Sequence, residues 1–119
     1  MDVESFRNYC LSKPGVTEEF PFDENTLVFK VMNKMFALTG LEREPFQVNL
    51  KCDPERAIEL REDHIDIIEG WHMSKKHWNT IFFENGLSDK LLSELIDHSY
   101  ELVVAKLKKS DKEILKNLS

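Results

Sequence analysis

One stretch of this sequence concentrates the side chains that could do chemistry. Residues 70–78 hold both tryptophans, two of the four histidines and the adjacent lysines Lys75 and Lys76. No acidic residue lies between Gly70 and Phe83, although the chain has 22 of them. Lysine ammonium groups pair with phosphates, and aromatic rings stack on nucleobases. The stretch therefore predicts a surface that binds an anion or a nucleic acid.

The candidate contact residues come from this stretch and from the neighbouring sheet. They are Lys34, Lys51, Trp71, His72, Lys75, Lys76 and His77. A simpler interpretation stays open beside this one. Trp78 begins a predicted strand and would be buried, Trp71 would tether the loop, and paired lysines are common on solvated surfaces.

The patterns that indicate catalysis or metal binding are weak. His72 and His77 are five residues apart, which places them on opposite faces of a strand and out of register on a helix. The chain has no C-x-x-C, H-E-x-x-H, Walker or G-x-G-x-x-G pattern. Cys52 lies before a predicted helix, where a thiol pKa can fall, but a buried, inert thiol is the commoner outcome. We expect no enzyme activity, no cofactor and no metal site.

Two other charged groups have simple explanations. An acidic cluster could attract cations, as the acidic ridge of frataxin does, although a solvated helix face and loop explain it as well. Its members are Glu59, Glu62, Asp63, Asp66 and Glu69. The basic run at residues 106–109 lies at the predicted end of a helix, where cations complement the helix dipole.

Composition limits the class of protein. The chain has 119 residues, which predicts one domain spanning residues 1–119. A net charge of −6 opposes non-specific binding to duplex DNA. Cys10 and Cys52 are far apart in sequence and are expected to be reduced, and the N-terminus lacks the basic start of a secretory signal. We expect a cytoplasmic monomer that does not bind membranes.

The elements that must position these residues follow from periodicity and capping. Helices are predicted over residues 2–12, 53–62 and 88–108, with a last short helix capped by Ser110. Strands are predicted over 26–32, 35–39, 46–51 and 77–83. Residues 17–23 are expected to form an extended loop anchored on the core by Phe20 and Phe22, and residues 64–69 a connection. The order predicts an α+β fold with helices packed on one face of an antiparallel sheet.

Several short motifs occur in an order that resembles the MmcQ/YjbR family. They are Phe20-Pro21-Phe22, Phe29-Lys30-Val31, Lys34-Met35-Phe36-Ala37, Val48-Asn49-Leu50-Lys51, Asp53-Pro54-Glu55, residues 70–79 and Ser99-Tyr100. The resemblance runs from the first helix to about Lys109. Trp71 and Glu69 depart from it, because the family more often has tyrosine and proline there.

The resemblance implies a CyaY-like, or frataxin-like, α+β fold. It also implies a double-wing arrangement of sheet and hairpins, for which the family is labelled DNA-binding. Its signature positions here are Pro21, Phe22, Lys34, Lys51, His72, Lys75, Lys76, His77 and Trp78. No catalytic role comes with them. We therefore expect a binding module for nucleic acid, with two alternatives: a protein–protein adaptor that uses the aromatic loop and residues 20–22, or a frataxin-like metal-binding protein.

Overall fold

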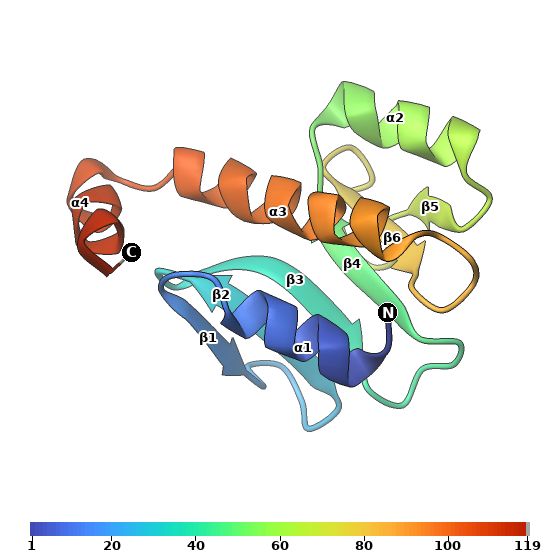
Figure 1. The fold of residues 1–119 in the computed structure, drawn as a ribbon, viewed down its shortest axis with the longest axis horizontal. Helices are drawn as coiled ribbons and strands as arrows, with labels where there is room; N and C mark the ends of the chain where they lie inside the picture. The colour runs from blue at the N-terminus through green and yellow to red at the C-terminus, as the bar shows by residue number, and fades with distance from the viewer. Residues whose placement is uncertain (119) are drawn as a thin grey trace.

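Ten helices and strands follow one another along residues 1–118, which are the residues that the computed structural model describes (Figure 1). In chain order they are α1 (Val3–Leu11), β1 (Val16–Glu19), β2 (Thr26–Val31), β3 (Lys34–Gly40), β4 (Gln47–Lys51), α2 (Pro54–Asp63), β5 (Ile67–Glu69), β6 (Trp78–Phe82), α3 (Asp89–Ala105) and α4 (Lys109–Leu118). The α+β class is confirmed.

All six strands pair into one antiparallel sheet in the order β1-β2-β3-β4-β6-β5. Two of these strands were missed, since β1 forms where a loop was expected and β5 where a connection was expected. Both are short edge strands, whose pairing partners lie elsewhere in the chain. Val16 opposes Val31, and Ile67 opposes Ile81, so the pairing defines these strands more than their own composition does.

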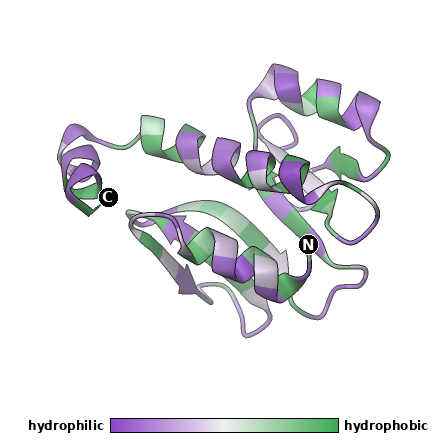
Figure 2. Ribbon diagram, viewed as in Figure 1, coloured by the Kyte–Doolittle hydropathy of each residue, from purple (hydrophilic) through white to green (hydrophobic). Residues whose placement is uncertain are grey.

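The helices cover one face of the sheet, as predicted. Buried residues of α1 and α3, such as Phe6 and Ile96, share a single core with Phe29, Leu50 and Ile81 from the strands. In Figure 1, α1 and α3 lie across the same side of the sheet, and in Figure 2 hydrophilic and hydrophobic residues alternate along their ribbons. Burial of one apolar stripe per helix stabilises this layer.

Alternation along the strands turns a second set of side chains to the opposite face. Leu38 opposes Asn49, Asn49 opposes Thr80, and Thr80 opposes Ile68. A smaller apolar cluster of Val28, Leu38 and Trp78 lies here, with Met35 and Met73 packed against it. We call this side the open face, because the buried residues of the helices belong to the other side.

Candidate functional site

The segment that begins at Gly70 approaches the sheet closely. Gly70 N–H donates to the Trp78 carbonyl at 2.9 Å, and a Cβ on Gly70 would lie only 2.7 Å from the Trp78 Cβ and 2.8 Å from its oxygen. Glycine is therefore required at this position for space. The close approach holds the loop between β5 and β6 against the open face.

Strands β4 and β6 hold the backbone of Trp71 in place. Trp71 N–H donates to Thr80 Oγ1 at 2.9 Å, and Asn49 Nδ2 donates to the Trp71 carbonyl at 3.1 Å. Thr80 Oγ1 in turn donates to Asn49 Oδ1, so the three residues form a closed network. The next residue, His72, has a φ of 58°, in the left-handed region, and lies in a turn.

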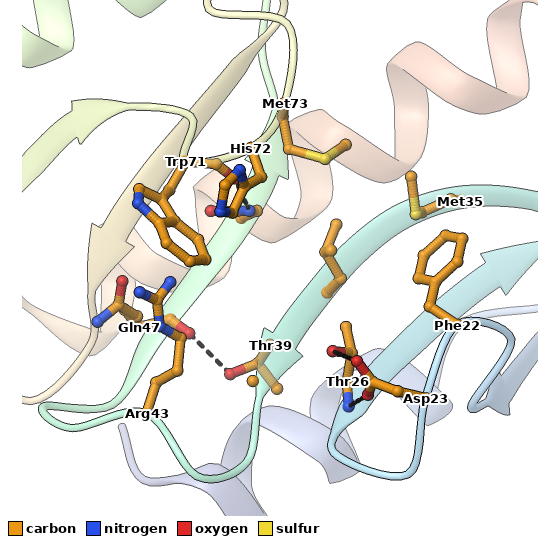
Figure 3. Close-up of a pocket in the computed structure, with 13 residues that line it drawn as sticks. Phe22, Asp23, Thr26, Met35, Thr39, Arg43, Gln47, Trp71, His72 and Met73 are labelled. Carbon is orange, nitrogen blue, oxygen red and sulfur yellow. Dashed lines mark hydrogen bonds between the residues drawn. The ribbon is translucent and has the colours of Figure 1, made fainter.

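Arg43 reaches Trp71 from the connection between β3 and β4. Its guanidinium carbon lies 3.3 Å from the centre of the Trp71 indole, and the His72 ring lies 3.7 Å from that indole. No carboxylate within residues 1–118 forms an ion pair with Arg43. Trp71 is 47% exposed, so this stacked pair faces solvent (Figure 3).

A cavity of about 360 Å³ extends from this stacked pair across the open face. Its apolar lining comes from Phe22, Met35, Leu38 and Met73. The polar side chains are Asp23, Thr26, Thr39, Gln47 and Asn49. Figure 3 shows these residues arranged around a common space, with Arg43 and Trp71 on one side and Phe22 opposite. Its size and mixed lining suit a small ligand or a single nucleotide unit.

The one carboxylate that lines the cavity, Asp23, already accepts hydrogen bonds from the turn in which it lies. Asp23 accepts hydrogen bonds from Asn25 N–H at 2.8 Å and from Thr26 N–H at 2.7 Å. These bonds, with Asn25 contributing most, lower the pKa of Asp23 below its ordinary value. Arg43 is thus the charged side chain of the cavity that keeps its hydrogen-bonding capacity for a ligand.

The five predicted contact residues of the loop separate into three places. Trp71 and His72 line the cavity. Lys75 lies outside it and pairs with Glu69 at 3.8 Å, while Lys76 is exposed. The His77 carbonyl accepts a hydrogen bond from Cys52 N–H at 2.8 Å, so the backbone of this residue ties the loop to the end of β4.

The two sheet lysines lie apart from the cavity lining. Lys51 opposes Trp78, and desolvation lowers its pKa, with a further contribution from the nearby charge of Lys106. Lys34 follows the β2–β3 turn and lines a different cleft. The structure therefore brings only Trp71 and His72 of the seven predicted residues into the cavity.

The prediction from the sequence did not include Arg43 or the polar side chains that line the cavity. Arg43 stands between Glu42 and Glu44, which is typical of a solvated loop. Phe22 and Asn49 did carry a signal, because both lie in motifs of the family resemblance. The expectation that Phe20 and Phe22 anchor their loop on the core is wrong, since they are 51% and 67% exposed.

The thiols are poorly suited to nucleophilic chemistry. Cys52 is buried, and desolvation raises its pKa to about 11, while that of Cys10 rises to about 12. Both cysteines are free. Among residues 1–118, no group of three or more His, Cys, Asp or Glu side chains is arranged to hold a metal ion.

This geometry defines a class of small α+β protein with a half-covered antiparallel sheet and a cavity on its open face. The YjbR family model matches residues 11–102, and the chain belongs to this family. The uncharacterized protein YjbR of Escherichia coli K12 is 32% identical over 119 residues, covering 99% of this chain and all of the relative. Protein YbdF of Escherichia coli O157:H7 is 37% identical, covering 91% and 88%.

Solved structures share the fold. The crystal structure of the Deinococcus radiodurans protein DR2400, of domain family DUF419, superposes with a TM-score of 0.89 at 42% identity, covering 96% of this chain and 87% of that one. A crystal structure from Pseudomonas syringae gives a TM-score of 0.74 at 26% identity, covering 86% and 98%. The names of these relatives state no catalytic activity. None of the helices in residues 1–118 combines the length and apolar character that a membrane crossing requires.

Proposed function

We propose that this protein is a non-catalytic, monomeric binding module that takes one unpaired nucleotide unit of a single-stranded nucleic acid into the open-face cavity. The stack of Arg43 on Trp71 at 3.3 Å is the observation that carries this proposal. Bases stack on aromatic rings and on guanidinium planes, and an unpaired guanidinium also attracts a phosphate.

A single strand fits better than a duplex for two reasons. The chain has a net charge of −6, which repels the dense charge of duplex DNA. The cavity of about 360 Å³ admits one base, and the side-chain oxygen of Gln47 offers an acceptor to its edge. The predicted loop lysines, Lys75 and Lys76, are outside the cavity and would contact neighbouring phosphates.

Trp71 fluorescence provides the test. Unlabelled single-stranded DNA, single-stranded RNA and duplex DNA of equal length are titrated at low and moderate salt. We expect the single strands to quench the exposed Trp71 and to bind more tightly than the duplex. Because base–aromatic stacking contributes ~1–3 kcal/mol per base, Trp71→Ala should weaken binding by that amount. The affinity of this variant is measured by titration calorimetry, because it lacks the reporting indole.

Charge variants separate the cavity from the loop. Arg43→Gln should weaken single-strand binding, whereas Lys90→Gln removes the same charge from an exposed position on α3 and should not. Lys75→Glu with Lys76→Glu should mainly reduce the salt dependence. The proposal fails if the duplex binds as well as the single strands, or if Arg43→Gln and Trp71→Ala both bind like the unmodified protein.

A protein–protein adaptor is the second candidate. The observation that favours it is a shallow apolar surface beside α1, where Val3, Phe20 and Leu41 are 42%, 51% and 47% exposed. Capture of a protein partner that resists nuclease treatment and is lost in Phe20→Ser, with Trp71→Ala unaffected, would favour the adaptor. The two free, buried thiols also support a cytoplasmic location, which cell fractionation would test.

A further inference from the structure

A second cleft lies where the β2–β3 hairpin meets the junction of α3 and α4. Its volume is about 410 Å³, and Figure 1 shows the hairpin ending beside α4. The residues that line it are Met32, Asn33, Lys34, Lys106, Leu107, Lys108 and Asp111. Segments far apart in the sequence thus bring three lysines together, and the open-face cavity shares none of these residues.

The charge in this cleft is unbalanced. Three lysines face it with one carboxylate, Asp111, in a chain whose net charge is −6. Within residues 1–118, none of Lys34, Lys106 and Lys108 forms an ion pair. Lys51 lies close enough for the charge of Lys106 to contribute to its lowered pKa. An anion placed in the cleft would be attracted by all three ammonium groups.

The structure also changes the explanation for the basic run at residues 106–109. The last turn of α3 contains no basic residue, and α4 already begins at Lys109. Lys108 therefore precedes the first turn of α4, where a side-chain acceptor is preferred and a cation opposes the helix dipole. The dipole of α3 accordingly does not account for Lys108 and Lys109, and Lys108 adds to the positive charge that lines the cleft.

We propose that this lysine cleft binds a small molecule with two linked phosphate groups, of the diphosphate class. Three ammonium groups against one carboxylate leave an excess of two positive charges. The lysines come from two separate segments, the β2–β3 hairpin and the junction of α3 and α4, so two linked phosphate groups can contact both segments at once. Lysine binds phosphate as a point charge, so the site is selective for charge density more than for the organic group attached. This site is independent of the open-face cavity and does not rest on the proposed function.

The test is a titration of the whole chain with pyrophosphate and with orthophosphate, followed by backbone amide NMR. We expect saturable shifts at Asn33, Lys34 and residues 108–111, with tighter binding of pyrophosphate. Lys34→Gln with Lys108→Gln should raise the dissociation constant for pyrophosphate by about tenfold or more. Lys75→Gln with Lys76→Gln removes two charges elsewhere and should leave it unchanged.

Asp111→Asn provides a variant with the opposite expected effect. It removes the one carboxylate of the cleft while keeping its size, so pyrophosphate should bind more tightly. The proposal is overturned if the shifts do not saturate, persist in the Lys34 and Lys108 double variant, or centre on residues 70–78, or if Asp111→Asn fails to tighten binding. Trp71→Ala should keep pyrophosphate binding, so failure of the nucleotide proposal and failure of this one are distinguishable.

Discussion

At the scale of single residues, the candidate site depends on one glycine and one stacked pair. Gly70 allows the loop to approach Trp78, and Trp71 and Arg43 then meet above the sheet. The motif around residues 70–78 identified the right segment, but it emphasised lysines that lie outside the cavity. The side chain that completes the stack comes from a loop with no distinguishing pattern of its own.

Gly70→Ala should destabilise the protein. The added Cβ would meet the Trp78 Cβ at 2.7 Å and the Trp78 carbonyl oxygen at 2.8 Å, and neither can move freely. We expect a loss of ~1–3 kcal/mol in the free energy of unfolding, measured by urea denaturation. Gly40→Ala is the matched control, since its Cβ would meet the flexible Arg43 side chain at 2.9 Å. Equal losses in the two variants would contradict this explanation.

At the scale of elements, α3 contributes more than an apolar stripe. Ser99 Oγ donates to the Phe36 carbonyl at 2.5 Å and accepts from Lys51 N–H at 2.9 Å. Between β3 and β4 only two residue pairs are in register, Ala37 with Leu50 and Leu38 with Asn49. The hydroxyl of Ser99 therefore completes the ladder where the strands separate, and it fixes α3 on the sheet.

Ser99→Ala should leave the Phe36 carbonyl and the Lys51 N–H without this partner. The expected loss is ~1–3 kcal/mol, the cost of unsatisfied buried polar groups, measured by thermal or urea unfolding. Ser110→Ala is the control. Ser110 was predicted to cap the last helix, but α4 begins at Lys109, so Ser110 lies inside it. Alanine there should be neutral or slightly stabilising, and a loss as large as that of Ser99→Ala would mean that the predicted cap was right.

At the scale of the whole molecule, a histidine joins two helices. His98 of α3 accepts a hydrogen bond at its Nε2 from Asp53 N–H, directly before α2, at 3.1 Å. Burial lowers the pKa of His98 below its ordinary value of 6.5, and the charge of Arg56 lowers it further. Only the neutral ring can accept this bond, so α2 and α3 are joined best when His98 is unprotonated.

This arrangement predicts a pH dependence of stability. The unfolded chain binds a proton at His98 at higher pH than the folded chain does. Its contribution is therefore complete above pH 6.5 and is lost as the pH falls through the folded pKa. Urea unfolding at about pH 7.5 and about pH 5.5 should show a larger loss for the unmodified protein than for His98→Gln, which cannot titrate. Equal losses would assign the pH dependence to other groups.

Positive side chains line two places on the surface of this acidic molecule. The open-face cavity and the lysine cleft beside α4 are both lined by cations that form no ion pair among the described residues: Arg43 in the first, and Lys34, Lys106 and Lys108 in the second. Competition between single-stranded DNA and pyrophosphate would reveal any coupling between them.

The elements that could be predicted from the sequence are those specified by neighbouring residues. Alternation predicted the central strands, Asp53 and Pro54 predicted the start of α2, and the ordered motifs predicted the family and the α+β fold. The tertiary structure decided what depends on distant partners: the edge strands β1 and β5, the stack of Arg43 on Trp71, and the meeting of Lys34 with Lys106 and Lys108. The reason is physical. Periodicity and caps act within a few residues, whereas a site forms from side chains that only the packing of the sheet brings together.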